Sequence, residues 1–148
     1  MKSQTKNLIE NLMKMKKMTT VNKKYIIKSE DQYGEKTFEI VKGFHEVRSL
    51  GAYRRYFYLS KHGECEIILT NNSITIIRKG TFSNTFEILF TGEKNKFLYE
   101  TDLIKEIFYS YGENINYDIK NKIFSFSYKL FDTNNNEINR ITFSIKEI

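Results

Sequence analysis

The position of Arg78 raises the clearest chemical question in this chain. In the segment SITIIRK, strict alternation puts Ile74, Ile76 and Arg78 on the same face of a predicted strand. A guanidinium on an apolar face is costly to bury alone, so it requires a carboxylate, a bound anion or water. One interpretation is a structural ion pair that closes one end of a barrel, with Glu46 or Glu106 as the partner.

The other interpretation is an anion clamp inside a barrel. Arg78 would then bind the carboxylate or phosphate of a small amphipathic molecule, and Arg55, Tyr53 and Tyr128 would contribute further contacts. Small β-barrels are able to hold one small ligand, which makes this chemistry feasible. The many Phe and Tyr side chains argue the other way, because they could fill the lumen.

The segment GAYRRYFYLS, residues 51–60, has aromatic side chains on both faces of a predicted strand. Alternation gives one face with Tyr53, Arg55, Phe57 and Leu59, and another with Arg54, Tyr56 and Tyr58. We assign the first face to the interior, because Phe57 and Leu59 have no polar group to place in water. The second face would then be a surface for interaction with RNA or a protein, with tyrosine rings available for base stacking.

The charge distribution disfavours nucleic acid as a partner. The net charge is +6, but residues 1–24 hold seven lysines and only one acidic residue, Glu10. The rest of the chain has 17 basic and 17 acidic side chains and is therefore neutral. Nucleic-acid-binding grooves are positively charged, and this body shows no such excess.

No catalytic or metal-binding motif is present in the sequence. The two histidines, His45 and His62, have no companion at the spacing of metal ligands. Cys65 lies between Glu64 and Glu66, and neighbouring acids disfavour a thiolate. We therefore expect no enzyme activity, no catalytic residue, no metal and no cofactor.

The cysteine content and the lengths of the apolar segments predict the cellular compartment. A single cysteine cannot form an internal disulfide, and no apolar segment has the length of a secretory signal or of a membrane helix. The abundance of Lys, Ile, Asn, Tyr and Phe is typical of an A/T-rich, bacterial genome. We expect a cytoplasmic bacterial protein; the sequence does not indicate its oligomeric state.

The chain divides into two parts. Residues 1–20 have apolar side chains at helical spacing among lysines, which predicts a short amphipathic N-terminal helix or extension. Residues 21–148 alternate between short runs rich in Ile, Phe, Tyr and Thr and turns rich in Gly, Asn and Asp, which indicates an all-β domain. The predicted strands are residues 22–30, 36–47, 53–60, 64–70, 73–79, 84–91, 96–101, 104–111, 114–119, 122–132 and 138–147. Tight connections predict an antiparallel up-and-down meander that closes into a barrel.

Several predicted strands have one apolar and one polar face, which assigns their orientation. The apolar faces are Cys65, Ile67 and Leu69; Ile115, Tyr117 and Ile119; Phe124, Phe126, Tyr128 and Leu130; and Ile141, Phe143 and Ile145. We expect these side chains to point into the barrel.

The order of GAYRRYFYLS, CEIILT, ITIIRKG, FEILFTG, FLYET and a final alternating pair resembles a bacterial group of calycin-like barrels, the YwiB-like group. The resemblance covers about residues 23–147. It implies a lipocalin-like architecture and carries no ligand or catalytic residue with it. The leading hypothesis is a non-enzymatic binding protein for a small amphipathic or anionic molecule, and the alternative is a packed barrel that acts through its outer surface.

Overall fold

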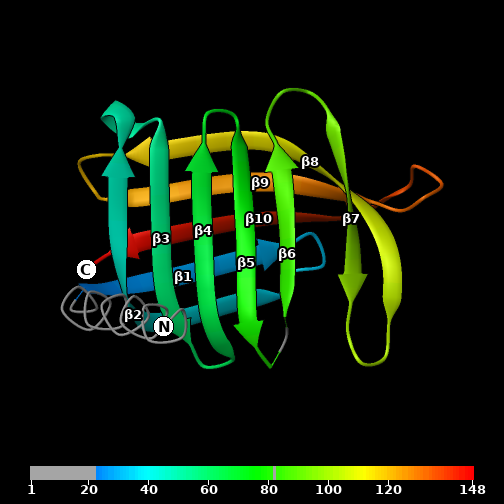
Figure 1. The fold of residues 1–148 in the computed structure, drawn as a ribbon, viewed down its shortest axis with the longest axis horizontal. Coiled ribbons are helices and arrows are strands. Elements are labelled where there is room, and N and C mark those ends of the chain that lie inside the picture. The colour runs from blue at the N-terminus through cyan, green and yellow to red at the C-terminus, as the bar shows by residue number, and fades with distance from the viewer. Residues whose placement is uncertain (1–22, 82) are drawn as a thin grey trace, which may run out of the picture.

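The computed structural model describes residues 23–81 and 83–148, and this part of the chain is all-β (Figure 1). The predicted N-terminal helix over residues 1–20 lies outside the described residues. The strands are β1 (Lys23–Asp31), β2 (Lys36–Arg48), β3 (Tyr53–Ser60), β4 (Gly63–Thr70), β5 (Ser73–Gly80), β6 (Asn84–Leu89), β7 (Lys94–Glu100), β8 (Lys105–Asp118), β9 (Ile123–Phe131) and β10 (Glu137–Glu147). A 3-10 turn, Ser49–Gly51, joins β2 to β3.

The ten described strands form one antiparallel sheet with the order β6-β5-β4-β3-β2-β1-β10-β9-β8-β7. Consecutive strands pair with each other except for β6 and β7, and β1 pairs with β10, so the sheet curls back on itself. The front layer, β3 to β6, runs steeply across the rear layer of β1, β10 and β9 (Figure 1). The predicted all-β meander, curled into a nearly closed barrel, is confirmed.

The barrel is not closed by a backbone ladder, because β6 and β7 lie beside each other without pairing. Side chains bridge this seam instead. The Nδ2 of Asn95 and the Oγ of fully buried Ser110 both donate to the Glu87 carbonyl, at 2.9 and 3.0 Å. A Cβ added to Gly112 would lie only 2.5 Å from the Phe90 ring, so glycine allows the close approach of β8 at this seam.

The prediction of two separate strands at 104–111 and 114–119 is wrong. Both belong to β8, and the segment YGEN between them is a β-bulge at Gly112–Asn114 rather than a turn. The preceding turn forms without glycine. The Thr101 hydroxyl accepts hydrogen bonds from the backbone N–H groups of Leu103 and Ile104, at 3.3 and 3.1 Å.

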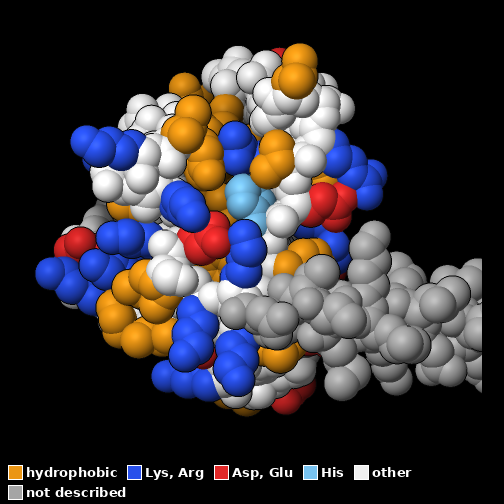
Figure 2. All heavy atoms as spheres, turned by 90° about the vertical axis from the view of Figure 1, so that its left-hand side faces the viewer, with side chains coloured by type: hydrophobic (Ala, Val, Ile, Leu, Met, Phe, Trp, Pro, Cys, Tyr) orange, Lys and Arg blue, Asp and Glu red, His pale blue; other side chains and the backbone are white. Residues whose placement is uncertain are grey.

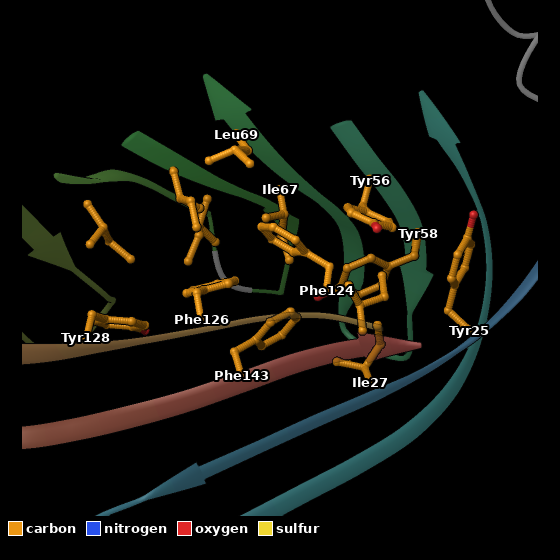
Figure 3. Packing of buried hydrophobic residues seen from close by; sticks show 14 of the residues in the cluster. Tyr25, Ile27, Tyr56, Tyr58, Ile67, Leu69, Phe124, Phe126, Tyr128 and Phe143 are labelled. Carbon is orange, nitrogen blue, oxygen red and sulfur yellow. The ribbon is translucent and has the colours of Figure 1, made fainter. Parts of the chain in front are cut away.

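The core consists of side chains that point inward from both layers (Figure 3). The predicted inward faces of β4, β5, β9 and β10 are confirmed. Their fully buried members include Ile67, Ile74, Phe124 and Ile145. Ile119 is the exception among the predicted apolar positions, because it follows the end of β8 and is exposed.

The predicted orientation of β3 is wrong. Tyr56 and Tyr58 lie opposite Ile67 and Cys65 of β4, and residues that lie opposite each other share a face of the sheet. Both tyrosines are therefore in the core, with 3% and 5% of their surfaces exposed. Phe57 points outward instead, where it is buried and stacks on Phe44 with ring centroids 5.2 Å apart.

Candidate ligand site

Arg78 lies near the end of β5, beside a cavity of about 220 Å³. Its side chain follows Ile74 and Ile76 on the inward face, as predicted, but it reaches the exposed rim of the lumen. Tyr58 and Tyr128 line the cavity with it, and the apolar lining comes from Ile67, Ile76, Phe126, Ile141 and Phe143. Packed side chains, many of them aromatic, fill the core of the barrel (Figure 3).

The predicted ion pair between Arg78 and Glu46 or Glu106 is wrong. Within the described residues, no carboxylate lies within 4 Å of the Arg78 guanidinium. Glu46 instead pairs with Arg48 and Arg55 on the outer surface. The charge of Arg78 is therefore left for solvent or a ligand to neutralise.

Three carboxylates, those of Glu30, Asp31 and Glu35, also lie at the cavity rim. Asp31 is held by the β1–β2 turn, because its Oδ1 accepts the backbone N–H groups of Tyr33 and Glu35 at 2.9 and 3.0 Å. Glu30 lies 3.9 Å from the Lys36 ammonium group. The rim therefore has a positive side on β5 and an acidic side on the turn.

A crevice of about 500 Å³ adjoins the cavity and shares Tyr58 and Arg78 with it. Four cationic side chains line this crevice, namely Lys36, Lys61, Arg78 and Lys79, against two carboxylates, Glu39 and Glu64. Glu39 is already engaged, because it accepts hydrogen bonds from the Ser60 hydroxyl at 3.0 Å and the Lys61 N–H at 2.6 Å. The crevice therefore favours anions, in contrast to the acidic side of the cavity rim on the β1–β2 turn.

Burial keeps Tyr58, Tyr128 and Cys65, which lie near Arg78, in their protonated forms. Burial raises the pKa of Tyr128 to about 12, although the charge of Arg78 acts in the opposite direction. Burial also raises the pKa values of Tyr58 and of the Cys65 thiol, which lie opposite each other in the β3–β4 pair. These groups are hydrogen-bond donors at neutral pH and not nucleophiles.

Two of the four predicted ligand-binding residues, Arg55 and Tyr53, are not at the cavity. Arg55 points outward and binds Glu66 through two nitrogens, with Nη2–Oε1 and Nε–Oε2 distances of 2.7 and 3.4 Å. Its guanidinium also lies 5.2 Å from the centre of the Phe44 ring. Tyr53 lies against Arg48, whose guanidinium is 5.5 Å from the ring centre. The structure brings together only Arg78 and Tyr128.

The predicted surface of Arg54, Tyr56 and Tyr58 is also wrong as a stacking platform, because the two tyrosines are in the core. Arg54 covers the ring of Tyr117 at 3.8 Å. It belongs to a cluster at the opposite end of the barrel that the sequence did not predict.

In this cluster, the rings of His45 and Tyr56 stack with centroids 4.0 Å apart. The Nε2 of His45 and the hydroxyl of Tyr25 are buried without a hydrogen-bond partner within the described residues. Burial, and then the charge of Arg54, lower the pKa of His45 to about 4. Figure 2 shows one side of the molecule, on which a histidine side chain lies among basic, acidic and hydrophobic side chains. His45 lies two residues after Gly43 and four after Val41, so all three share one face of β2. This spacing could have predicted that His45 points into the barrel.

Neither metal ligands nor a membrane helix are found in the described residues. No group of three His, Cys, Asp or Glu side chains is arranged to hold a metal ion there. The described part of the chain also has no helix with the length and apolar character needed to cross a membrane.

Comparison with known proteins identifies a solved structure with a similar fold. The chain matches no family model and no curated protein sequence. Among solved structures it is similar to the crystal structure of the ywiB protein from Bacillus subtilis, with a TM-score of 0.58 and 14% identity, over 84% of this chain and 89% of that one. The resemblance to the YwiB-like group is thus confirmed at the level of the fold, and this chain has the nearly closed β-barrel of the Bacillus subtilis YwiB protein.

Proposed function

We propose that this protein is a non-enzymatic binding protein for a small amphipathic molecule with an anionic group, held beside Arg78. The observation that carries the proposal is the guanidinium of Arg78 at the rim of a cavity lined by apolar and polar side chains, with no carboxylate within 4 Å of it in the described part of the chain. An anionic group on a ligand would neutralise it, and arginine suits carboxylate and phosphate because it donates through two parallel N–H groups.

The size of the cavity limits the ligand. A volume of about 220 Å³ is below the usual range of drug-sized pockets, roughly 300–1,000 Å³. Phe126 and Phe143 line the cavity and belong to the packed core, which leaves no space for a long acyl chain beside them. The apolar part of the ligand is therefore small, and any larger polar part would extend into the adjoining crevice.

The tyrosines would supply polar contacts. Tyr58 and Tyr128 keep their protons at neutral pH, so their hydroxyls are able to donate to ligand oxygens. Nothing in this set supports an activated nucleophile, because the Cys65 thiol has a raised pKa. We therefore favour binding over catalysis. The proposal also includes a calycin- or lipocalin-like role for the barrel and a cytoplasmic location.

The second candidate function, interaction with RNA or protein through the outer surface, loses the residues that motivated it. Tyr56 and Tyr58 are buried, and only Arg54 of that set reaches the rim of the barrel. An outer-surface role would have to use other residues.

Isothermal titration calorimetry with a small anionic probe, phenyl phosphate, tests the proposal. We expect saturable binding to the wild-type protein, weakened on the order of tenfold by Arg78→Leu, which removes a charge-assisted contact. The matched control is Lys42→Leu, which removes an exposed cation of β2 that does not line the cavity. Equal affinity of the wild type and Arg78→Leu, both with unchanged melting temperatures, would refute the role of Arg78.

A further inference from the structure

The outer edge of β7 lacks a strand partner in the described part of the chain. On one side β7 pairs with β8 along its whole length. On the other side β6 approaches its first half only through side chains, namely the Asn95 hydrogen bond and the stacking of Phe86 on Phe97, with ring centroids 4.8 Å apart. The hairpin of β7 and the first half of β8 stands beside β6 as a separate arm (Figure 1). Unpaired strand edges of this kind bind other strands.

The arm exposes large apolar side chains. They are Leu98, Tyr99, Leu103, Ile104 and Ile107, and Leu103 at the turn is 94% exposed. The turn itself is well ordered by hydrogen bonds, because Thr101 bonds the backbone of Leu103 and Ile104. A rigid arm that holds apolar groups in solvent is typical of an interaction surface.

The charges on β7 are complementary to those on β7 of a second copy, when the two strands are antiparallel. Lys96 and Glu100 are exposed on the same outward face as Leu98, and neither has an ion-pair partner within residues 23–81 and 83–148. In an antiparallel pair centred on Leu98, Lys96 lies opposite Glu100 of the second strand, and the reverse pair forms by symmetry. Leu98 then faces Leu98, and on the other face Phe97 lies opposite Tyr99.

We propose that the protein forms a two-fold dimer by antiparallel pairing of β7 with β7 of a second copy, centred on Leu98. The pairing satisfies the open backbone edge, covers Leu98 and Tyr99, forms two cross-strand ion pairs, and displaces β6 from its side-chain contacts with Asn95 and Phe97. A pair of seven-residue strands is a small interface, so we expect a weak dimer, with a dissociation constant on the order of micromolar. This assembly is independent of the Arg78 cavity.

Sedimentation velocity of the full chain over a range of concentrations tests the proposal. We expect a monomer–dimer equilibrium in the wild type. Lys96→Glu and Glu100→Lys each place like charges opposite each other at both symmetric positions, so each variant should raise the dissociation constant on the order of tenfold or more. An equimolar mixture of the two variants restores opposite charges at both positions in a mixed dimer. The mixture should therefore associate more tightly than either variant alone.

The control is Lys42→Glu, the same charge reversal at an exposed residue of β2 outside the arm, which should leave the equilibrium unchanged. The melting temperature of each variant verifies that it is folded. A wild-type protein that is monomeric at every concentration would overturn the proposal and leave the arm to a different partner. A dimer that ignores both charge reversals, or variants that fail to associate when mixed, would overturn this pairing.

Discussion

The Ser110 hydroxyl on β8 donates a hydrogen bond of 3.0 Å to the Glu87 carbonyl on β6. This bond crosses the seam of the barrel, where the neighbouring strands β6 and β7 do not pair. Asn95 on β7 donates to the same carbonyl from 2.9 Å. Two side chains thus take the place of a backbone ladder at the seam of the barrel.

Ser110→Ala should lower the free energy of unfolding by about 1 kcal/mol, because it removes a buried hydrogen bond but leaves Asn95 on the same carbonyl. The double variant Ser110→Ala with Asn95→Ala removes both donors and should lower it by about 2 kcal/mol or more. Urea denaturation measures both values. Ser125→Ala on the outward face of β9 is the control, with an expected change within about 0.5 kcal/mol. If the double variant is as stable as the wild type, the seam is not held by these bonds.

Tyr56→Ala should cost about 3–5 kcal/mol of stability, because Tyr56 is a core residue in contact with Tyr25, His45 and Phe124. Tyr53→Ala, a change of the same type on the outward face of β3, should cost less than about 1 kcal/mol. Thermal or urea unfolding of the two variants compares them directly. The reverse order of stabilities would restore the orientation that the sequence predicted for β3.

Stability should fall as the pH decreases from 7 to 5, because the pKa of His45 is about 4 in the folded protein against 6.5 in its ordinary state. The unfolded chain therefore takes up the proton first, and the loss is about 2 kcal/mol over this interval. Above pH 7 the histidine is neutral in both states and contributes no pH dependence.

Urea denaturation at several pH values measures this slope. His45→Phe should abolish most of it, whereas His62→Gln, which leaves His45 in place, should retain it. Glu147, whose pKa is lowered mainly by its hydrogen bond with Lys23, contributes only at lower pH, where carboxylates titrate. A wild-type stability that is flat from pH 7 to pH 5 would contradict the burial of the His45 ring.

The sequence predicted those strands in which one face is clearly apolar. In β9, for example, Phe124 and Phe126 alternate with serines, and only one orientation buries the aromatic rings. In β3 both faces carry aromatic side chains, so alternation did not distinguish inside from outside. The inward face of β3 is determined by its register with β4, which sets Tyr56 opposite Ile67. This register depends on tertiary pairing and not on the local sequence.

The segment YGEN was misread because glycine is a common turn residue, whereas Gly112 is needed for the close approach of Phe90 across the seam. This requirement comes from a strand distant in the sequence, so local patterns do not reveal it.

The candidate site was predicted only in part, because alternation assigns a side chain to the interior only where one face of its strand is clearly apolar. Arg78 and Tyr128 lie on strands with a clear apolar face, and both line the cavity. Arg55 was misplaced because its partner Glu66 is on the neighbouring strand, and their contact depends on the orientation of β3. Tyr58 was assigned to the outer surface by the same error, although it lies in the cavity wall.

Native mass spectrometry of the protein purified from its own source cells tests the central claim most directly. We predict a discrete adduct of one small anionic molecule on the wild-type protein, absent from Arg78→Leu and retained by the control Lys42→Leu, all with the charge states of folded protein. The adduct mass would then define the ligand class. An adduct that persists unchanged in folded Arg78→Leu, or a wild-type protein that carries no adduct and binds no anionic probe, would contradict the assignment of this cavity as an anion-binding site.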